Sequence, residues 1–248
     1  RKCGGDSAMD LMEYKAKELY GKYGIPSMQG IVVEDVEGLE AKVQGMNFPL
    51  VVKAQVQVGG RGKAGGIRFA DDVQQLLDAS GSILGMEIKG HAVKKLLIVE
   101  KVEVQEEWYL SIILDRLTKS PMIIFSAMGG IDIEETARTA PHKVMKLPID
   151  PLMGIKEYTA RYLLSKSGLA MERAGQFLEV LEKLYHMFCQ SDCLLAEINP
   201  LVITPDKGMI ALDGKISVDD SALFRQQDLL TFKSSLAEEE LVAEAAKF

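Results

Sequence analysis

The sequence has few cysteines, a single tryptophan and no long apolar run. Its three cysteines are an odd number in 248 residues, which excludes a disulfide scaffold and suits a reducing compartment. No apolar run reaches the ~18 residues that a membrane-spanning helix needs, so we expect no membrane association. Cys189, Cys193 and His186 lie in or beside an apolar segment with no fourth ligand nearby, so we expect them to pack in the core rather than bind zinc.

An excess of positive charge is also absent. Lysine and arginine number 29 against 36 aspartates and glutamates, which gives a net charge of −7. Because binding to nucleic acid rests on many contacts between basic side chains and phosphates, we expect no nucleic-acid partner. Apolar residues make up 47% and charged residues 26%, as in ordinary globular domains. At ~150 residues per domain, the chain makes one large domain or two small ones.

Short strand patterns alternate with helical patterns along the chain, which predicts an α+β (mixed α/β) fold rather than a purely parallel sheet. Helices are expected at residues 72–77, 157–168 and 172–190, with Gly81 beyond the first of them. Strands are expected at residues 31–33, 50–54, 67–69, 96–100, 108–114, 122–125, 194–203 and 209–212. The last two are joined by the turn 205–208, and residues 237–247 have a helical composition.

A further helix is predicted from Met9 onward. Asp10 and Glu13 have the spacing of a capping box, and Gly24 marks the end of the helix. Its buried face is predicted from apolar spacing to include Met12, Ala16, Leu19 and Tyr20. Residues 1–8 contain no apolar core of a signal peptide, and we interpret them as a remnant of cloning.

The segment 59–66 holds five glycines together with Arg61 and Lys63. Glycines allow the backbone to approach a ligand closely, and the two cations favour phosphate. Lys63 is followed by alanine, so this is not a Walker A loop, although Gly60 to Gly65 matches G-x-G-x-x-G. Because a strand pattern follows, we predict a hairpin tip that covers phosphates. The alternative is a mobile glycine hairpin without a ligand.

Lys53 lies in an apolar strand six residues before this glycine loop. A lysine there can point to solvent from an edge strand, but the neighbouring loop favours a lysine that faces phosphate. In a protein kinase the glycine loop precedes the lysine strand, whereas here the order is reversed. The His-Arg-Asp and Asp-Phe-Gly motifs of kinases are also absent from the sequence.

Two groups of acidic and amide side chains could complete such a site. Glu100 ends an apolar strand and is followed by Glu103 and Glu107, which could accept hydrogen bonds from a base and a ribose. The alternative is a solvated acidic loop. Glu197 and Asn199 share one face of a predicted strand, and Asp213 follows the partner strand. Such oxygen ligands suit Mg²⁺, which substrate phosphates would complete.

These motifs, in this order, resemble the ATP-grasp portion of the succinyl-CoA ligase β-subunit family. The resemblance runs from about Met9 to Gln226, and malate–CoA ligase β subunits share nearly all of it. The matching segments are residues 13–17 (Glu-Tyr-x-Ala-Lys), 52–56, 59–66, 99–100, 129–134, 197–202, 213–215 and 222–226.

The resemblance implies an ATP-grasp fold whose two lobes enclose a nucleotide. The ATP-grasp domain would span residues 9–233, with a smaller nucleotide-covering subdomain at about 29–104. By that resemblance Glu197 faces a phosphohistidine carried by a partner α subunit, and Asn199 and Asp213 bind Mg²⁺. It also implies a nucleotide-binding set: Lys53, Gly60, Arg61 and Gly62 at the phosphates, Glu100 at the base, Glu107 at the ribose, and Glu103 in a region one residue shorter than in some relatives.

The implied reaction joins succinate and CoA to succinyl-CoA while ATP (or GTP) yields ADP (or GDP) and phosphate. The direct step from Lys63 to Ala64 and the apolar Met28 favour ATP, and an ADP-forming acid–thiol ligase. The expected location is the cytoplasm, or the mitochondrial matrix in a eukaryote. Family β subunits continue into a second domain, so we interpret residues 234–248 as an exit segment. As a truncated piece, the chain is expected to bind Mg-nucleotide without being active alone.

Overall fold

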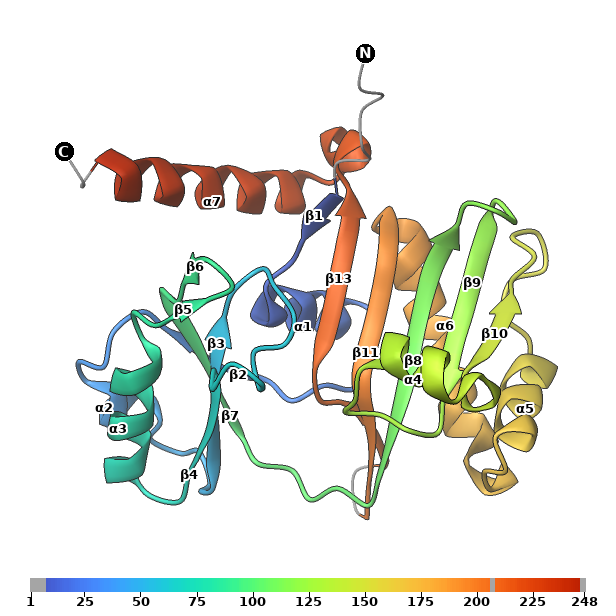
Figure 1. The fold of residues 1–248 in the computed structure, drawn as a ribbon, viewed down its shortest axis with the longest axis horizontal. Helices are drawn as coiled ribbons and strands as arrows, with labels where there is room; N and C mark the ends of the chain where they lie inside the picture. Colours follow the sequence, from blue (N-terminus) through green and yellow to red (C-terminus); the bar gives the residue numbers. More distant parts are fainter. Residues whose placement is uncertain (1–7, 206–207, 246–248) are drawn as a thin grey trace.

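Two separate antiparallel sheets define two lobes (Figure 1). The computed structural model describes residues 8–205 and 208–245. The large sheet has the order β1-β13-β11-β8-β9-β10, and β12 pairs with β11 as well. Its strands are β1 (Ala8–Asp10), β8 (Glu106–Asp115), β9 (Ser120–Ser126), β10 (Met145–Pro148), β11 (Cys193–Thr204), β12 (Gly208–Ala211) and β13 (Gly214–Asp219).

Helices α1 (Glu13–Lys22), α5 (Glu157–Lys166) and α6 (Ala174–Gln190) share the main hydrophobic core with this sheet. The short 3-10 turn Met171–Arg173 leads into α6. Trp108 lies at the centre of the core, with its ring 5.8 Å from Phe125 and 5.7 Å from Phe177 in edge-on contacts. Helix α4 (Ile133–Thr139) lies in front of the sheet in Figure 1, whereas α6 lies behind it. The long helix α6 therefore covers the back of the sheet, and the front of the sheet carries the short helix α4.

The small lobe is a four-stranded sheet of order β2-β7-β3-β4. Its strands are β2 (Gly30–Val33), β3 (Leu50–Gln55), β4 (Ile67–Ala70) and β7 (Lys95–Glu100). A second core under this sheet includes Leu39 of α2 (Leu39–Lys42) and Leu76 of α3 (Val73–Ile83). Strands β5 (Glu87–Ile88) and β6 (His91–Ala92) form a separate hairpin. The predicted smaller subdomain, about residues 29–104, encloses this sheet.

The remaining elements link the lobes to the end of the chain. The 3-10 turns Pro141–Lys143 and Asp220–Arg225 precede β10 and α7, respectively. Helix α7 (Gln227–Ala245) runs from the end of the large sheet across the top of Figure 1. Across residues 8–205 and 208–245, we find no helix with the length and apolar content of a membrane span.

The predicted mixed α/β fold and nearly all of the predicted strands agree with the structure, but several local predictions were wrong. Residues 8–10 form strand β1 rather than the start of a helix, because Met9 pairs with Val218 along the edge of β13. Glu13 makes no capping box and is buried instead. Helix α3 continues through Gly81 to Ile83. Cys193 is buried as predicted, whereas Cys189 and His186 are exposed.

Six further elements gave no signal that we recognised: α2, α4, β5, β6, β10 and β13. Helix α4 follows a pair of glycines, yet Asp132 caps it by accepting hydrogen bonds from the backbone of Glu134 and Glu135. Strand β13 begins at Gly214 and β10 has only four residues, so neither shows a long alternating pattern. The centre of the predicted turn 205–208 lies outside the described residues.

Close packing of α1 against β13 requires a glycine at position 214. A Cβ added there would lie 2.3 Å from the hydroxyl of Tyr20, which is fully buried and donates a hydrogen bond to the backbone carbonyl of Glu197 at 2.7 Å. Tyr20 thus joins α1 to β11, which bears Glu197, and to the start of β13, which follows Asp213.

We expect Gly214→Ala to lower the free energy of unfolding by about 1–3 kcal/mol, the usual cost of overpacking a core. Gly175→Ala in the first turn of α6 is the control, because a Cβ there meets nothing within 4 Å. That variant should gain about 0.5–1 kcal/mol from the better helix propensity of alanine. Urea denaturation of both variants measures the difference, and equal stabilities would contradict the packing argument.

Candidate functional site

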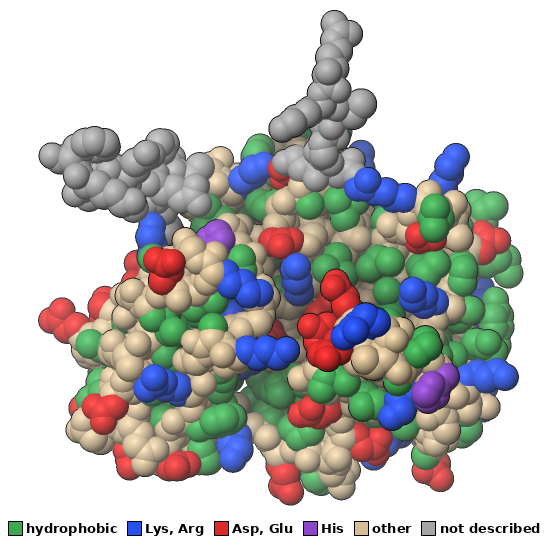
Figure 2. Space-filling view, viewed as in Figure 1, with side chains coloured by type: hydrophobic (Ala, Val, Ile, Leu, Met, Phe, Trp, Pro, Cys, Tyr) green, Lys and Arg blue, Asp and Glu red, His purple; other side chains and the backbone are tan. Residues whose placement is uncertain are grey.

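A cavity of about 770 Å³ lies between the two lobes. The small lobe contributes residues 56–63 and Lys89, whereas the large lobe contributes Glu197, Asn199, Asp213 and the segment 130–134. Figure 2 shows acidic and basic side chains gathered near the middle of this face, where the lobes meet. The cavity therefore joins the two groups of site residues that the sequence predicts separately.

Glu13 on the first turn of α1 is the centre of a buried charge cluster. Its side chain is only 1% exposed. One carboxylate oxygen, Oε1, lies 2.8 Å from Lys53 Nζ and 3.4 Å from Lys17 Nζ, while Oε2 lies 2.7 Å from Arg61 Nη1. Burial by itself would raise the pKa of the Glu13 carboxyl, but the charges of Lys53, Arg61 and Lys17 outweigh it and hold this pKa far below its usual range. Glu13 is therefore ionised.

Arg61 connects the lobes through this cluster. Its Nη2 donates to both carboxylate oxygens of Asp213, at 2.8 and 2.7 Å, while Nη1 donates to Glu13. Lys53 crosses between lobes in the same way, since its Nζ also donates to the backbone carbonyl of Leu212 at 3.1 Å. The two cations predicted to hold phosphates are thus bound to protein oxygens in this structure.

Glu197 is held by a neighbouring strand of the same sheet. Tyr109 Oη on β8 lies 2.8 Å from Glu197 Oε2 and 3.0 Å from Ser111 Oγ. Because a phenol has one proton, Tyr109 donates it to the carboxylate and accepts from the serine. Burial raises the pKa of Glu197, and the hydrogen bond from Tyr109 opposes that rise. The carboxylate therefore faces the cavity in a fixed orientation.

Asn199 is held by the loop before α4. Its Oδ1 accepts a hydrogen bond from the backbone N–H of Gly130 at 2.8 Å, and its Nδ2 donates to the carbonyl of Ile131 at 3.1 Å. A Cβ at Gly129 would lie 2.4 Å from the carbonyl oxygen of Trp108, so this loop passes too close to β8 for any larger residue. Two backbone groups thereby fix the orientation of the Asn199 side chain, and with it the direction of its oxygen.

The oxygens near Asp213 have the chemistry of a magnesium site. The backbone N–H of Asn199 on β11 donates to the carbonyl of Asp213 at 3.1 Å, so Asn199 lies beside the residue that precedes β13. Both side chains line the cavity and offer hard oxygen ligands. Among the described residues, no group of three or more His, Cys, Asp or Glu side chains is arranged to hold a metal. A magnesium ion here would need phosphate oxygens to complete its coordination.

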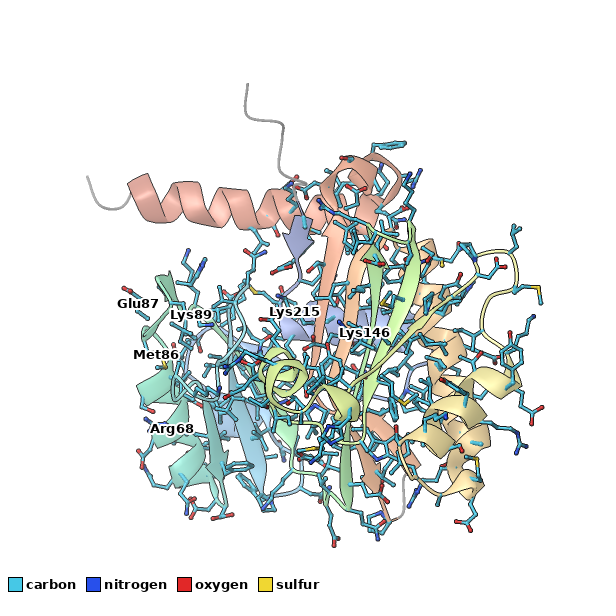
Figure 3. All side chains as sticks on the ribbon, turned by 45° about the vertical axis from the view of Figure 1, so that its right-hand side comes forward. Arg68, Met86, Glu87, Lys89, Lys146 and Lys215 are labelled. Carbon is cyan, nitrogen blue, oxygen red and sulfur yellow. The ribbon has the colours of Figure 1, made fainter. Side chains whose placement is uncertain are left out.

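The glycine loop is the tip of the β3–β4 hairpin, in which Lys53 pairs with Ile67. The turn closes by a hydrogen bond from the backbone N–H of Gly66 to the carbonyl of Arg61 at 2.9 Å. Gly60 has φ of +84°, and a Cβ there would lie 3.3 Å from Lys89 Nζ. Lys89 and Lys215 line the cavity from opposite lobes, and Figure 3 shows them on the β5–β6 hairpin and β13, respectively.

The structure does not bring every predicted residue to the cavity. Gly60, Arg61 and Gly62 line it together with Glu197, Asn199 and Asp213. Lys53 lies behind Glu13 and is not among the described lining residues. Glu100, Glu103 and Glu107 also lie in the described part of the chain but outside this wall. Glu100 accepts two hydrogen bonds from Asn47, and Glu107 lies beside Gly130.

Sequence reasoning assigned no role to Lys17, Tyr109, Lys89 or Lys215. Lys17 had a usable signal, since a lysine four residues after Glu13 lies on the same helix face. Of the predicted apolar face of α1, Ala16 and Tyr20 are buried, and Met12 and Leu19 are partly buried against the core; the structure adds Glu13 and Lys17 to the buried residues. Tyr109 and Lys89 had none, because their partners lie in distant segments.

The family model described as an ATP-grasp domain matches residues 10–203, which is more than half of the chain. The chain belongs to the ATP-grasp domain family. Two curated relatives carry the name succinate–CoA ligase [ADP-forming] subunit beta. The protein from Desulfatibacillum aliphaticivorans is 43% identical over 97% of this chain, and the one from Rubrobacter xylanophilus is 42% identical over 89%.

The chain spans 64% and 58% of the length of these two relatives. Among solved structures, the ATP citrate lyase from Methanothrix soehngenii covers 89% of this chain with a TM-score of 0.69 and 24% identity, over 53% of its own length. A dinucleotide-forming acetyl-coenzyme A synthetase from Ca. Korarchaeum cryptofilum covers 84% with a TM-score of 0.67 and 18% identity, over 93% of its own length. At these identities the likeness concerns the ATP-grasp fold.

We expect Tyr109→Phe to raise the pKa of Glu197 further, because the variant loses the hydrogen bond that favours the ionised carboxylate. Titration of side-chain carboxyl signals by ¹³C NMR measures this shift, with the Glu197 signal assigned through Glu197→Gln. Tyr158→Phe is the control, since Tyr158 is exposed on α5. If the pKa of Glu197 stayed constant or fell in Tyr109→Phe, Tyr109 would not stabilise the ionised Glu197 carboxylate by a hydrogen bond.

Proposed function

We propose that this chain is the nucleotide-binding part of an ADP-forming succinate–CoA ligase β subunit. The observation that carries the proposal is the meeting of Arg61 and the glycine loop with Asn199, Asp213 and Glu197 across one cavity. A cavity with cations on one wall and oxygen ligands on the other suits a Mg-nucleoside triphosphate. The names of the two relatives support succinate over malate and ATP over GTP.

The residues of the candidate site would have separate roles in the proposed reaction. Arg61 and Lys53 would turn from Glu13 and Asp213 to the phosphate oxygens, and the N–H groups of the glycine loop would cover them. Glu100, Glu103 and Glu107 stay our proposed acceptors for the base and ribose. They lie at the end of β7, in the connection from β7 to β8, and at the start of β8, so a nucleotide there would extend beyond the cavity described above.

Asn199 and Asp213 would hold Mg²⁺ beside the phosphates. When bound, the ion would neutralise phosphate charge and polarise the terminal phosphoryl group. Arg61 would leave Asp213 for the phosphates when Mg²⁺ binds, so the Asp213 carboxylate would exchange the guanidinium for the metal ion. Gly130 would keep its hydrogen bond to Asn199, because a carbonyl oxygen has a second lone pair for the metal.

Glu197 would serve the transfer of the phosphoryl group to a histidine of a partner α subunit. Its carboxylate can accept the other imidazole N–H and so select the tautomer that receives phosphate. Succinate and CoA would then react to succinyl-CoA with release of phosphate. We infer that residues 9–233 form the ATP-grasp domain, and that the chain alone binds Mg-nucleotide without completing the reaction.

We expect nucleotide binding to need the metal, and Asp213→Ala to remove that need. Wild-type protein should bind Mg·ATP at least about tenfold, or ~1.4 kcal/mol, more tightly than ATP in EDTA. Loss of Asp213 removes an anionic ligand but also frees Arg61, so the ratio should fall below about threefold, or ~0.7 kcal/mol. Calorimetric titrations with and without Mg²⁺ give both affinities.

Asp228→Ala is the matched control for this charge change, because Asp228 is 81% exposed and is not among the described residues that line the cavity. It should keep the wild-type ratio. An unchanged ratio in Asp213→Ala would show that Asp213 is not a metal ligand, whereas an absence of ATP binding in the wild type would contradict the proposed function itself.

For the complex with the α subunit, we expect Glu197→Gln to bind Mg·ATP within about threefold of wild type but to phosphorylate the partner histidine roughly 100-fold more slowly. The amide keeps the shape and loses the charge. Rapid-quench assays with γ-labelled ATP measure the transfer. Glu134→Gln, another acid that lines the cavity, should transfer at the wild-type rate. A wild-type rate in Glu197→Gln would leave Glu197 as a structural neighbour of Asn199.

A further inference from the structure

Lys17 lies behind the charge cluster and contributes nothing to the cavity wall. Its side chain is 3% exposed, and it is absent from the described residues that line the cavity, whereas Glu13 is among them. Its Nζ lies 3.4 Å from Glu13 Oε1 and makes no hydrogen bond with any described residue. Burial of an ammonium group with one ion pair and no hydrogen bond is costly, so its presence calls for an explanation.

The cluster has a surplus of positive charge. Lys17, Lys53 and Arg61 oppose Glu13 and Asp213, which leaves one positive charge in a buried space beside the cavity. Glu13 forms closer ion pairs with Lys53, at 2.8 Å, and with Arg61, at 2.7 Å. Lys17 is therefore the weakest partner of Glu13 in this arrangement. Burial, together with the nearby charge of Lys53, lowers the pKa of Lys17 to about 8.

A bound polyphosphate would change these pairings. If Lys53 and Arg61 turned from Glu13 to the phosphates, this fully buried carboxylate would lose its two close ion pairs. The loss of one partner from a buried ion pair is strongly unfavourable. Lys17 is four residues from Glu13 on α1 and remains beside it whatever the hairpin does.

We propose that Lys17 is a positioning residue that pairs with Glu13 when Lys53 and Arg61 turn from this carboxylate to the phosphates of a nucleotide. The inference rests on the proposed function in taking the ligand to be a nucleoside triphosphate. Lys17 lowers the cost of releasing both cations and does not touch the ligand. Glu13 in turn holds Arg61 at the cavity wall and Lys53 behind it while no phosphate is bound.

Lys17→Met tests this pairing by calorimetry of the folded chain. Without Lys17, Glu13 retains Lys53 and Arg61, and the Kd for Mg·ATP should rise about tenfold. Addition of Glu13→Gln should bring the Kd back to within about threefold of wild type, because the carboxylate that competes with phosphate is gone. Lys22→Met on the same helix is the control, since Lys22 is 63% exposed, and its Kd should not change.

Three results would overturn the proposal. If Lys17→Met binds weakly and Glu13→Gln does not restore binding, Lys17 contacts the ligand directly. If only the Tm falls and the Kd is unchanged, Lys17 has a structural role. If Glu13→Gln restores Lys89→Met equally well, the effect is general charge in the cavity and not a specific pair, because Lys89 lies on the cavity wall.

Inorganic tripolyphosphate as a second probe separates this inference from the proposed function. It has phosphates but no base or ribose, so the same pattern of Kd values should appear with it even if the wild type binds no ATP. A crystal structure of the wild type with a Mg-bound ATP analogue serves if Lys17→Met does not fold. Lys17 Nζ should then lie within about 3.2 Å of a Glu13 oxygen. Lys53 and Arg61 still on Glu13, or Lys17 on the phosphates, would overturn the inference.

Discussion

The buried carboxylate of Glu13 is the contact on which the arrangement of the site depends. It stands on the first turn of α1, between the hairpin of the small lobe and the strands of the large lobe. It forms ion pairs with Lys53 and Arg61 of the small lobe. Arg61 then reaches Asp213 of the large lobe. The lobes are thus joined by charged groups that are also the proposed ligand contacts. Any anion that enters the cavity competes with Glu13 and Asp213 for the same donors, so its affinity is a difference between two sets of ion pairs.

Features that rest on neighbouring residues could be predicted from the sequence. The glycine hairpin follows from a dense run of glycines between two strand patterns, and the structure places Lys53 and Ile67 as a pair at its base. The helices α5 and α6 and the strands β7, β8, β9 and β11 follow from apolar periodicity, because their burial is regular along each element. Glu197 and Asn199 were expected on one face of a strand, and both line the cavity.

Features that rest on distant pairs could not be predicted in this way. Asp10 and Glu13 carry the local pattern of a helix cap, but strand pairing of residues 8–10 with β13 and the attraction of Glu13 to Lys53 and Arg61 are stronger than that local preference. Arg61 and Asp213 are 152 residues apart in sequence. Glu100 and Glu107 were expected at the ligand from their place after an apolar strand and from the resemblance, and the cavity wall as it stands does not include them.

The same reasoning explains why the polar groups that line the site are paired with one another and with the backbone. Asp213 accepts from Arg61 and from the backbone of Gly214, Asn199 is fixed by Gly130 and Ile131, and Tyr109 holds Glu197. Unpaired buried donors and acceptors would destabilise the fold, so a site for a highly charged ligand must satisfy itself when the ligand is absent. Groups that the backbone directs, such as the Asn199 oxygen, can keep their positions on binding. Groups that pair only with other side chains, such as Arg61 and Lys53, have to exchange partners, and a residual partner such as Lys17 makes that exchange possible without leaving an isolated buried charge.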